Sequence, residues 1–258
     1  MILAIIGNKG GTAKTATAIS LAAGLGLRRR RSLLIDLDSQ GSASLSLGVR
    51  RADFDPSIAD VILAGHSIAG AIRKTSAGMD LVTGSAALAD ADVQLARIPG
   101  REDRLKAALT PIRADYDFII LDCPPSLGLL AVDALVAADA YLIPTPPEYL
   151  ALEGLVGITE AVQRIQAGIG ASCRLAGILL TRVDRRRKVT EEIVQIIRRH
   201  YRDQVFRAEI PVDVHLVEAP SFGQTIFQYA GRSAAAEAYR QLTDEIIHRS
   251  IYRKGRTS

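Results

Sequence analysis

The residues with the clearest potential for chemistry lie near the start of the chain. An apolar stretch at residues 2–6 leads into a glycine-rich loop, and an amphipathic stretch begins near Lys14. Glycines let backbone N–H groups turn inward around phosphate oxygens, and a helix start adds partial positive charge. Lys14 can reach β- and γ-phosphates, and the Thr15 hydroxyl can ligate Mg²⁺. The residues of this predicted nucleotide-binding loop are Lys9, Gly10, Gly11, Thr12, Ala13, Lys14, Thr15 and Ala16.

The loop matches the phosphate-loop pattern G-x-x-x-x-G-K-S/T with two departures. Gly7 lies one residue before the first glycine position, which Asn8 occupies, and Ala13 stands where the pattern has glycine before the lysine. The alternative is an ordinary glycine-rich turn between a strand and a helix that binds nothing. The flanking strand and helix patterns, together with the acidic residues downstream, favour a nucleotide site.

Two later apolar stretches end in aspartate. Asp36 and Asp38 close the stretch at residues 32–37, and Asp122 follows residues 118–121. Ligands of open α/β sheets bind beyond the carboxyl ends of the strands, so these carboxylates are expected beside the phosphate loop. Aspartates at strand ends also often cap the next helix, and the pattern alone leaves both roles open.

The elements that would position these residues alternate along the chain. Short, almost wholly apolar stretches predict strands buried on both faces at 2–6, 32–37, 79–82, 118–121, 140–143 and 175–180. Helical patterns occupy 14–30, 101–113, 151–169, 190–201 and 233–251. We therefore predict an α/β fold, a doubly wound and mainly parallel sheet flanked by helices, as one domain over residues 1–258. Residues 48–78 are expected to form an exposed segment with short helices, and residues 252–258 a basic tail.

Charge is distributed unevenly along the 258 residues. The net charge is +4, whereas residues 182–202 hold eight basic and three acidic side chains. Such a patch suits salt-sensitive, sequence-independent binding of double-stranded DNA, although a solvated basic face is the alternative. The apolar stretches are too short to span a membrane, and the two cysteines lack metal-ligand spacing, so we expect a cytoplasmic protein. The candidate DNA-binding residues are Arg182, Arg185, Arg186, Arg187, Lys188, Arg198, Arg199 and Arg202.

The second loop lysine, Lys9, makes the loop resemble the deviant Walker A motif K-G-G-x-x-K-S/T of the ParA/MinD ATPases. Residues 36–41 are similar to the D-x-D-P-Q-G segment of that family, residues 122–125 to its D-x-P-P switch, and residues 146–154 to its P-x-P-E-Y/F-x-A-L-E-G stretch. Residues 210–213 and 218–221 resemble its I-P and E-A-P-S segments. The resemblance extends from Ile2 to about Leu242 and implies the P-loop NTPase fold.

The resemblance also implies roles for single residues. Lys9 would reach the nucleotide of a partner subunit across a dimer interface, and Asp38 would orient or activate the attacking water. Asp122 would hold Mg²⁺ together with Thr15, and Asp36 would support the metal shell. The residues expected to line the adenine are Pro211 and Asp213.

The function implied is that of a ParA-like partition ATPase. ATP with Mg²⁺ would drive formation of a homodimer that binds DNA on the nucleoid, and a ParB-like adaptor would stimulate hydrolysis to position a chromosome, plasmid or protein cargo. The main alternative is a MinD-like membrane-cycling ATPase, which needs a lipid-binding C-terminal helix; residues 245–254 are basic with few apolar positions. A nucleotide-dependent metal-cluster carrier would need paired cysteines, and Cys123 and Cys173 form no such motif.

Overall fold

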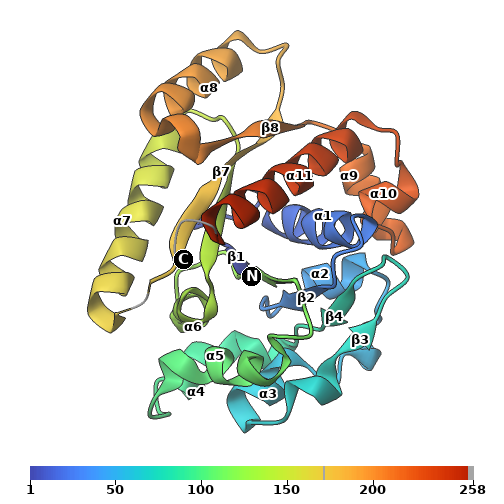
Figure 1. The fold of residues 1–258 in the computed structure, drawn as a ribbon, viewed down its shortest axis with the longest axis vertical. Coiled ribbons are helices and arrows are strands. Elements are labelled where there is room, and N and C mark those ends of the chain that lie inside the picture. The colour runs from blue at the N-terminus through green and yellow to red at the C-terminus, as the bar shows by residue number, and fades with distance from the viewer. Residues whose placement is uncertain (171, 255–258) are drawn as a thin grey trace.

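A central eight-stranded sheet organises the chain (Figure 1). The computed structural model describes residues 1–170 and 172–254, with side chains through residue 250. The strand order is β3-β4-β2-β5-β1-β6-β7-β8, and only the pairing of β3 with β4 is antiparallel. The predicted fold class is therefore confirmed. The strands are β1 (Ile2–Ile5), β2 (Ser32–Asp36), β3 (Arg73–Lys74), β4 (Asp80–Val82), β5 (Phe118–Asp122), β6 (Ala140–Thr145), β7 (Arg174–Val183) and β8 (Val205–Pro211).

Helices cover both faces of the sheet. Helices α1, α10 and α11 pack on one face, and α3 to α8 cover the other, as Figure 1 shows. The helices are α1 (Lys14–Leu27), α2 (Ser42–Ser46), α3 (Ile58–Ala64), α4 (Ala91–Leu95), α5 (Arg104–Leu109), α6 (Leu129–Ala137), α7 (Ala151–Ile169), α8 (Lys188–Tyr201), α9 (His215–Glu218), α10 (Ile226–Tyr229) and α11 (Ala234–Lys254). No helix in the described ranges is long and apolar enough to cross a bilayer.

Strand β1 shows why the apolar stretches are continuous. Successive side chains of a strand point to opposite faces of the sheet. Ile2 and Ala4 belong to the core on the α6 side, whereas Leu3 and Ile5 belong to the core beneath α1 and α11. Both faces of the strand are buried, so every position is apolar. The loop that follows β1 is therefore held at the middle of the sheet.

Several predicted elements differ from the structure. The helix expected at 101–113 is a short α5 between two 3₁₀ turns, because Pro111 cannot donate its backbone N–H to a continuing helix. Strand β8 was not predicted, since Arg207 and Glu209 interrupt its apolar pattern at the sheet edge. Helix α6 was also missed, because it is buried on most sides and shows little polar periodicity.

Two further expectations concern the less regular segments. Residues 48–78 contain short helices as predicted, but the expected exposure is wrong for α3, where Ile58 and Ile62 are buried in the core. The predicted basic tail at 252–258 begins inside α11, which continues to Lys254. Residues 255–258 lie outside the described part of the chain.

Candidate nucleotide-binding site

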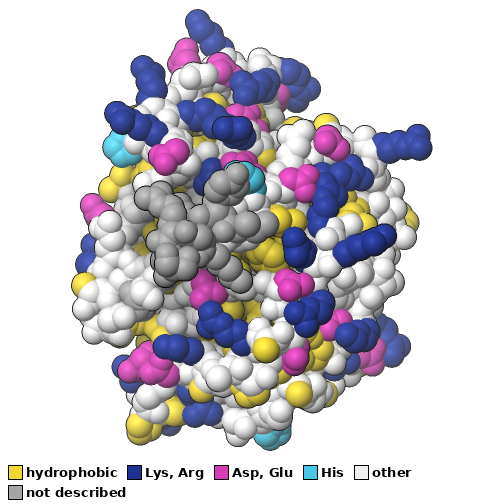
Figure 2. Space-filling view, viewed as in Figure 1, with side chains coloured by type: hydrophobic (Ala, Val, Ile, Leu, Met, Phe, Trp, Pro, Cys, Tyr) yellow, Lys and Arg dark blue, Asp and Glu magenta, His cyan; other side chains and the backbone are white. Residues whose placement is uncertain are grey.

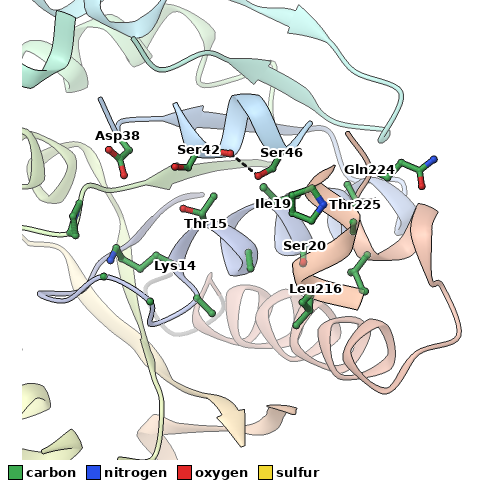
Figure 3. Close-up of a pocket in the computed structure, with 18 residues that line it drawn as sticks. Lys14, Thr15, Ile19, Ser20, Asp38, Ser42, Ser46, Leu216, Gln224 and Thr225 are labelled. Atoms are coloured by element: carbon green, nitrogen blue, oxygen red, sulfur yellow. Dashed lines mark hydrogen bonds between the residues drawn. The ribbon is translucent and has the colours of Figure 1, made fainter. Parts of the chain in front are cut away.

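A cavity of about 410 Å³ opens where the carboxyl ends of β1, β2 and β5 meet helix α1. Its volume falls in the range of small-molecule sites. Lys14, Thr15 and Asp38 lie at one end, and Leu216 and Thr225 lie at the other (Figure 3). One end is therefore polar and the other mostly apolar. The lining residues are Gly10, Gly11, Ala13, Lys14, Thr15, Ala16, Ile19, Ser20, Asp38, Ser42, Ser46, Pro125, Leu216, Ala219, Pro220, Gln224, Thr225 and Ile226.

The loop between β1 and α1 is shaped to receive an anion. Gly11 has φ 76° and Ala13 has φ 68°, so both lie in the left-handed region. Helix α1 then begins at Lys14 with no side chain capping its N-terminus and no acidic residue in its first turn. The N–H groups of that turn lack intrahelical acceptors and are free to bind a phosphate oxygen. The conformation of Ala13 also explains why the general pattern has glycine there.

Lys14 places a buried cation at the polar end of the cavity. Its side chain is largely buried, and Nζ donates a hydrogen bond of 2.8 Å to the carbonyl oxygen of Lys9. Burial lowers the pKa of Lys14, and the negative charges of Asp122 and Asp38 act in the opposite direction. The ammonium is thus held inside the loop, where little water competes with a phosphate for it.

Asp122 is the residue that best fits a divalent metal ion. It ends β5 directly beside Asp36 of β2, because the two are register partners in the parallel sheet. Both of its carboxylate oxygens are buried without a hydrogen-bond partner among the described residues. Burial and the neighbouring Asp36 raise its pKa well above the ordinary value, while the hydroxyl of Thr15 opposes the shift. An unpartnered buried carboxylate beside a hydroxyl is a suitable donor set for Mg²⁺.

Asp36 has a different environment, although it lies next to Asp122. One oxygen accepts hydrogen bonds from the backbone N–H (2.9 Å) and hydroxyl (2.7 Å) of Ser44, and the other accepts from the N–H of Asp38 (3.2 Å). These bonds fix the start of α2 and the turn that carries Asp38. Gly84 packs so closely that a Cβ there would lie 2.6 Å from the Asp38 carbonyl oxygen. The geometry favours a positioning role for Asp36.

Comparison with known proteins identifies the family. Residues 1–174 match a family model described as an AAA domain. The sporulation initiation inhibitor protein Soj of Bacillus subtilis is 38% identical over 246 residues, covering 95% of this chain and 97% of the relative. The chromosome partitioning protein ParA of Myxococcus xanthus is 40% identical over 249 residues, covering 96% of this chain and 88% of the relative. The chain belongs to the ParA family of partition ATPases.

A solved structure extends the comparison to the fold. The crystal structure of cobyrinic acid a,c-diamide synthase from Mycobacterium smegmatis, with bound ATP analogue and magnesium, has a TM-score of 0.84 and 33% sequence identity. The match covers 94% of this chain and 92% of that one. The ParA-family chain therefore shares its P-loop NTPase fold with a protein that holds nucleotide and metal.

Lys9, which distinguishes the deviant loop of the ParA family, lies outside the main cavity. Its side chain is exposed and lines a second, smaller groove of about 100 Å³ on the other side of the loop. That groove is shared with Glu148 and Gly154 at the start of α7 and with Arg182 of β7. The structure thus separates Lys14, which faces the cavity of its own chain, from Lys9, which faces outward.

Pro211 and Asp213 do not line the main cavity. The carboxylate of Asp213 accepts hydrogen bonds from the N–H of His215 (3.0 Å) and the N–H of Ala235 (3.1 Å), so it joins α9 to the start of α11. Pro211 instead lines a hollow between β7, β8 and α11. The apolar end is formed by residues that the site prediction lacked, although the E-A-P-S segment signalled part of them: Leu216, Ala219, Pro220, Gln224, Thr225 and Ile226.

Half of the basic candidates in this segment of the ParA-family chain form ion pairs with carboxylates. Figure 2 shows Lys and Arg mixed with acidic side chains over the end of the molecule formed by α8. Glu209 of β8, which lies outside the segment, forms ion pairs with both Arg185 and Arg198. Asp184 forms ion pairs with Arg186 and Arg187. Within residues 1–170 and 172–250, the candidates without a carboxylate partner are Arg182, Lys188, Arg199 and Arg202.

Proposed function

We propose that this chain binds Mg²⁺-ATP in the main cavity and acts as a ParA-type partition ATPase. The observation that carries the proposal is the buried, unpartnered carboxylate of Asp122 beside Thr15 and the Lys14 ammonium, at the uncapped start of α1. One end of the cavity supplies the charge complement of a polyphosphate and a metal ion. The mostly apolar end, with Leu216 and Pro220, suits the faces of a purine.

The positions of the site residues support the following roles. Lys14 and the N–H groups of the loop bind the β- and γ-phosphates, and Thr15 and Asp122 hold Mg²⁺, which neutralises phosphate charge when bound. Asp38 lies at the phosphate end and is only partly buried, so its carboxylate can orient a water for attack. Asp36 holds the turn that presents Asp38.

The proposed ATP-dependent homodimer rests on the outward position of Lys9. An exposed lysine at the rim of the loop can contact phosphates of a second copy that docks face to face. Tyr149 and Leu150, near the start of α7, are also exposed, with 90% and 49% of their surface accessible. Apolar surface next to the lysine is what a subunit interface requires.

DNA binding is proposed for a smaller set than the sequence suggested. Lys188, Arg199 and Arg202 carry charges that no carboxylate of the described residues offsets, so they are the stronger phosphate contacts. The dimer would bind double-stranded DNA without sequence preference, and a ParB-like adaptor would stimulate hydrolysis and release. Such a cycle positions a chromosome, plasmid or protein cargo on the nucleoid.

The C-terminal helix α11 supports the partition ATPase better than it supports the MinD-like alternative. Ile246 of α11 is 2% exposed and Ile247 packs against the core beneath α1, so these apolar side chains stabilise the fold. A lipid-binding helix would need such residues on its free face. The metal-cluster alternative is disfavoured because Cys123 and Cys173 are both buried, and the described residues contain no group of three or more His, Cys, Asp or Glu side chains that could hold a metal ion.

A paired assay tests the proposal. The purified protein with Mg²⁺-ATP is added to non-specific duplex DNA in a mobility-shift series and to anionic liposomes in a sedimentation series. We expect ATP-dependent DNA binding without liposome binding, and the reverse result would refute the partition function. Asp38→Ala should retain ATP-dependent dimerisation and DNA binding but hydrolyse ATP at least about a hundredfold more slowly, as for the loss of a group that positions the nucleophile. Loss of dimerisation with ATP bound would contradict the role given to Asp38.

A further inference from the structure

Arg182, predicted from sequence as a DNA contact, points instead at the phosphate loop. Its Nη1 donates a hydrogen bond of 3.3 Å to the carbonyl oxygen of Gly11. The preceding residue, Thr181, is fully buried, and its hydroxyl donates to the carbonyl oxygen of Thr12 at 3.1 Å. Two successive residues of β7 thus hold two successive carbonyls of the loop.

The direction of these carbonyls determines the direction of the phosphate-binding groups. In a planar trans peptide, the C=O and the following N–H point to opposite sides of the chain. With the Gly11 and Thr12 carbonyls turned toward β7, the N–H groups of Thr12 and Ala13 point away from it. Gly11 and Ala13 line the main cavity. The contacts from β7 therefore turn the N–H of Ala13, a residue of the cavity wall, away from β7 before any ligand arrives.

The backbone of Arg182 is itself held in an unfavourable conformation. Its φ is 53°, one of four positive values at non-glycine residues in the described ranges, and Ala13 is another. A left-handed arginine persists only where its surroundings determine it, and such residues are concentrated at functional sites. Arg182 bonds the Gly11 carbonyl, and the other strained residue, Ala13, lies two positions further along the same loop.

We propose that Arg182 is a positioning residue for the nucleotide, which pre-orients the phosphate loop through the Gly11 carbonyl and so raises nucleotide affinity in the absence of DNA. The inference rests on the proposed function, because it assumes that the cavity binds ATP. Arg182 lines the same groove as Lys9, so a second copy docked there would touch the group that sets the loop conformation.

The test compares three forms of the full chain by titration with fluorescent mant-ATP and Mg²⁺, without DNA. Arg182→Met removes the donor and keeps the aliphatic stem. Arg97→Met, at an exposed arginine outside the cavity and the groove, removes the same charge elsewhere. We expect Arg182→Met to bind mant-ATP about tenfold more weakly, the scale of one hydrogen bond from a charged donor. Arg97→Met should equal the wild type, and all three should melt at the same temperature without nucleotide.

The possible results distinguish a failure of the role proposed for Arg182 from a failure of ATP binding itself. Equal affinity of Arg182→Met and wild type would overturn the inference alone, and an accompanying loss of DNA affinity would return Arg182 to the DNA-binding set. Equal weakening by Arg97→Met would also overturn it, because the effect would then be one of net charge. If the wild type bound no mant-ATP, the proposed function and the inference would both fall.

Discussion

Asp133 provides a quantitative test of the structure, because it is a buried acid outside the nucleotide site. It lies on α6, the helix that follows the segment from Asp122 to Pro125, and it is 1% exposed. One oxygen accepts the N–H of Leu105 at 3.2 Å, and the other has no partner among the described residues. Burial raises the pKa of Asp133 from 3.8 to about 7, and the Leu105 hydrogen bond only partly opposes this.

The sign and size of the effect follow from proton linkage. Between pH 4 and 7 the folded chain keeps the proton that the unfolded chain releases, so rising pH favours unfolding. One pKa unit corresponds to about 1.4 kcal/mol, so Asp133 removes about 4 kcal/mol of unfolding free energy by pH 8, with about 3 kcal/mol of that between pH 5 and 8. Below the unfolded pKa the penalty is absent.

The perturbation is Asp133→Asn, which stays neutral and keeps an acceptor for the Leu105 N–H. Urea unfolding, followed by circular dichroism at pH 5 and pH 8 without nucleotide, measures both chains. Between pH 5 and pH 8, the free energy of unfolding of the variant should rise by about 3 kcal/mol relative to that of the wild type. Asp90→Asn, at an exposed aspartate, should follow the wild type. A difference between Asp133→Asn and wild type that is independent of pH would refute the reasoning.

Three further predictions concern the site and its surroundings. Lys14→Ala should abolish ATP binding in a calorimetric titration, because it removes the buried cation of the loop; unchanged affinity would contradict the site assignment. Ala13→Gly should raise the free energy of unfolding by about 1 kcal/mol in urea by relieving the left-handed alanine, and a decrease would argue against that strain. Glu209→Gln frees Arg198 and leaves Arg185 paired with Glu191 alone, so affinity for duplex DNA should rise and the salt dependence should steepen in a mobility-shift series; unchanged binding would exclude Arg198 from the DNA surface.

The identity of the central strands and of the phosphate loop could be read from the sequence. Short apolar stretches such as residues 2–6 have the length of strands buried on both faces, and the loop motif is local, so its residues are adjacent in the chain. Sequence patterns did not predict the elements whose burial depends on residues distant in the chain. Helix α6 is apolar nearly all round, and β8 carries Arg207 and Glu209 at the sheet edge.

What the sequence determined was the chemistry available: a glycine-rich loop with Lys9 and Lys14, and aspartates at strand ends. Those features depend on residue type and short-range spacing. The different roles of these residues were decided only by the tertiary structure. Register placed Asp36 beside Asp122, and hydrogen bonds then occupied Asp36 and left Asp122 unpartnered. Likewise, Arg182 belongs to the basic segment by sequence, but the end of β7 carries it to the phosphate loop, a contact between residues 171 positions apart. Contacts at such separations depend on strand order and packing, which short-range patterns do not encode.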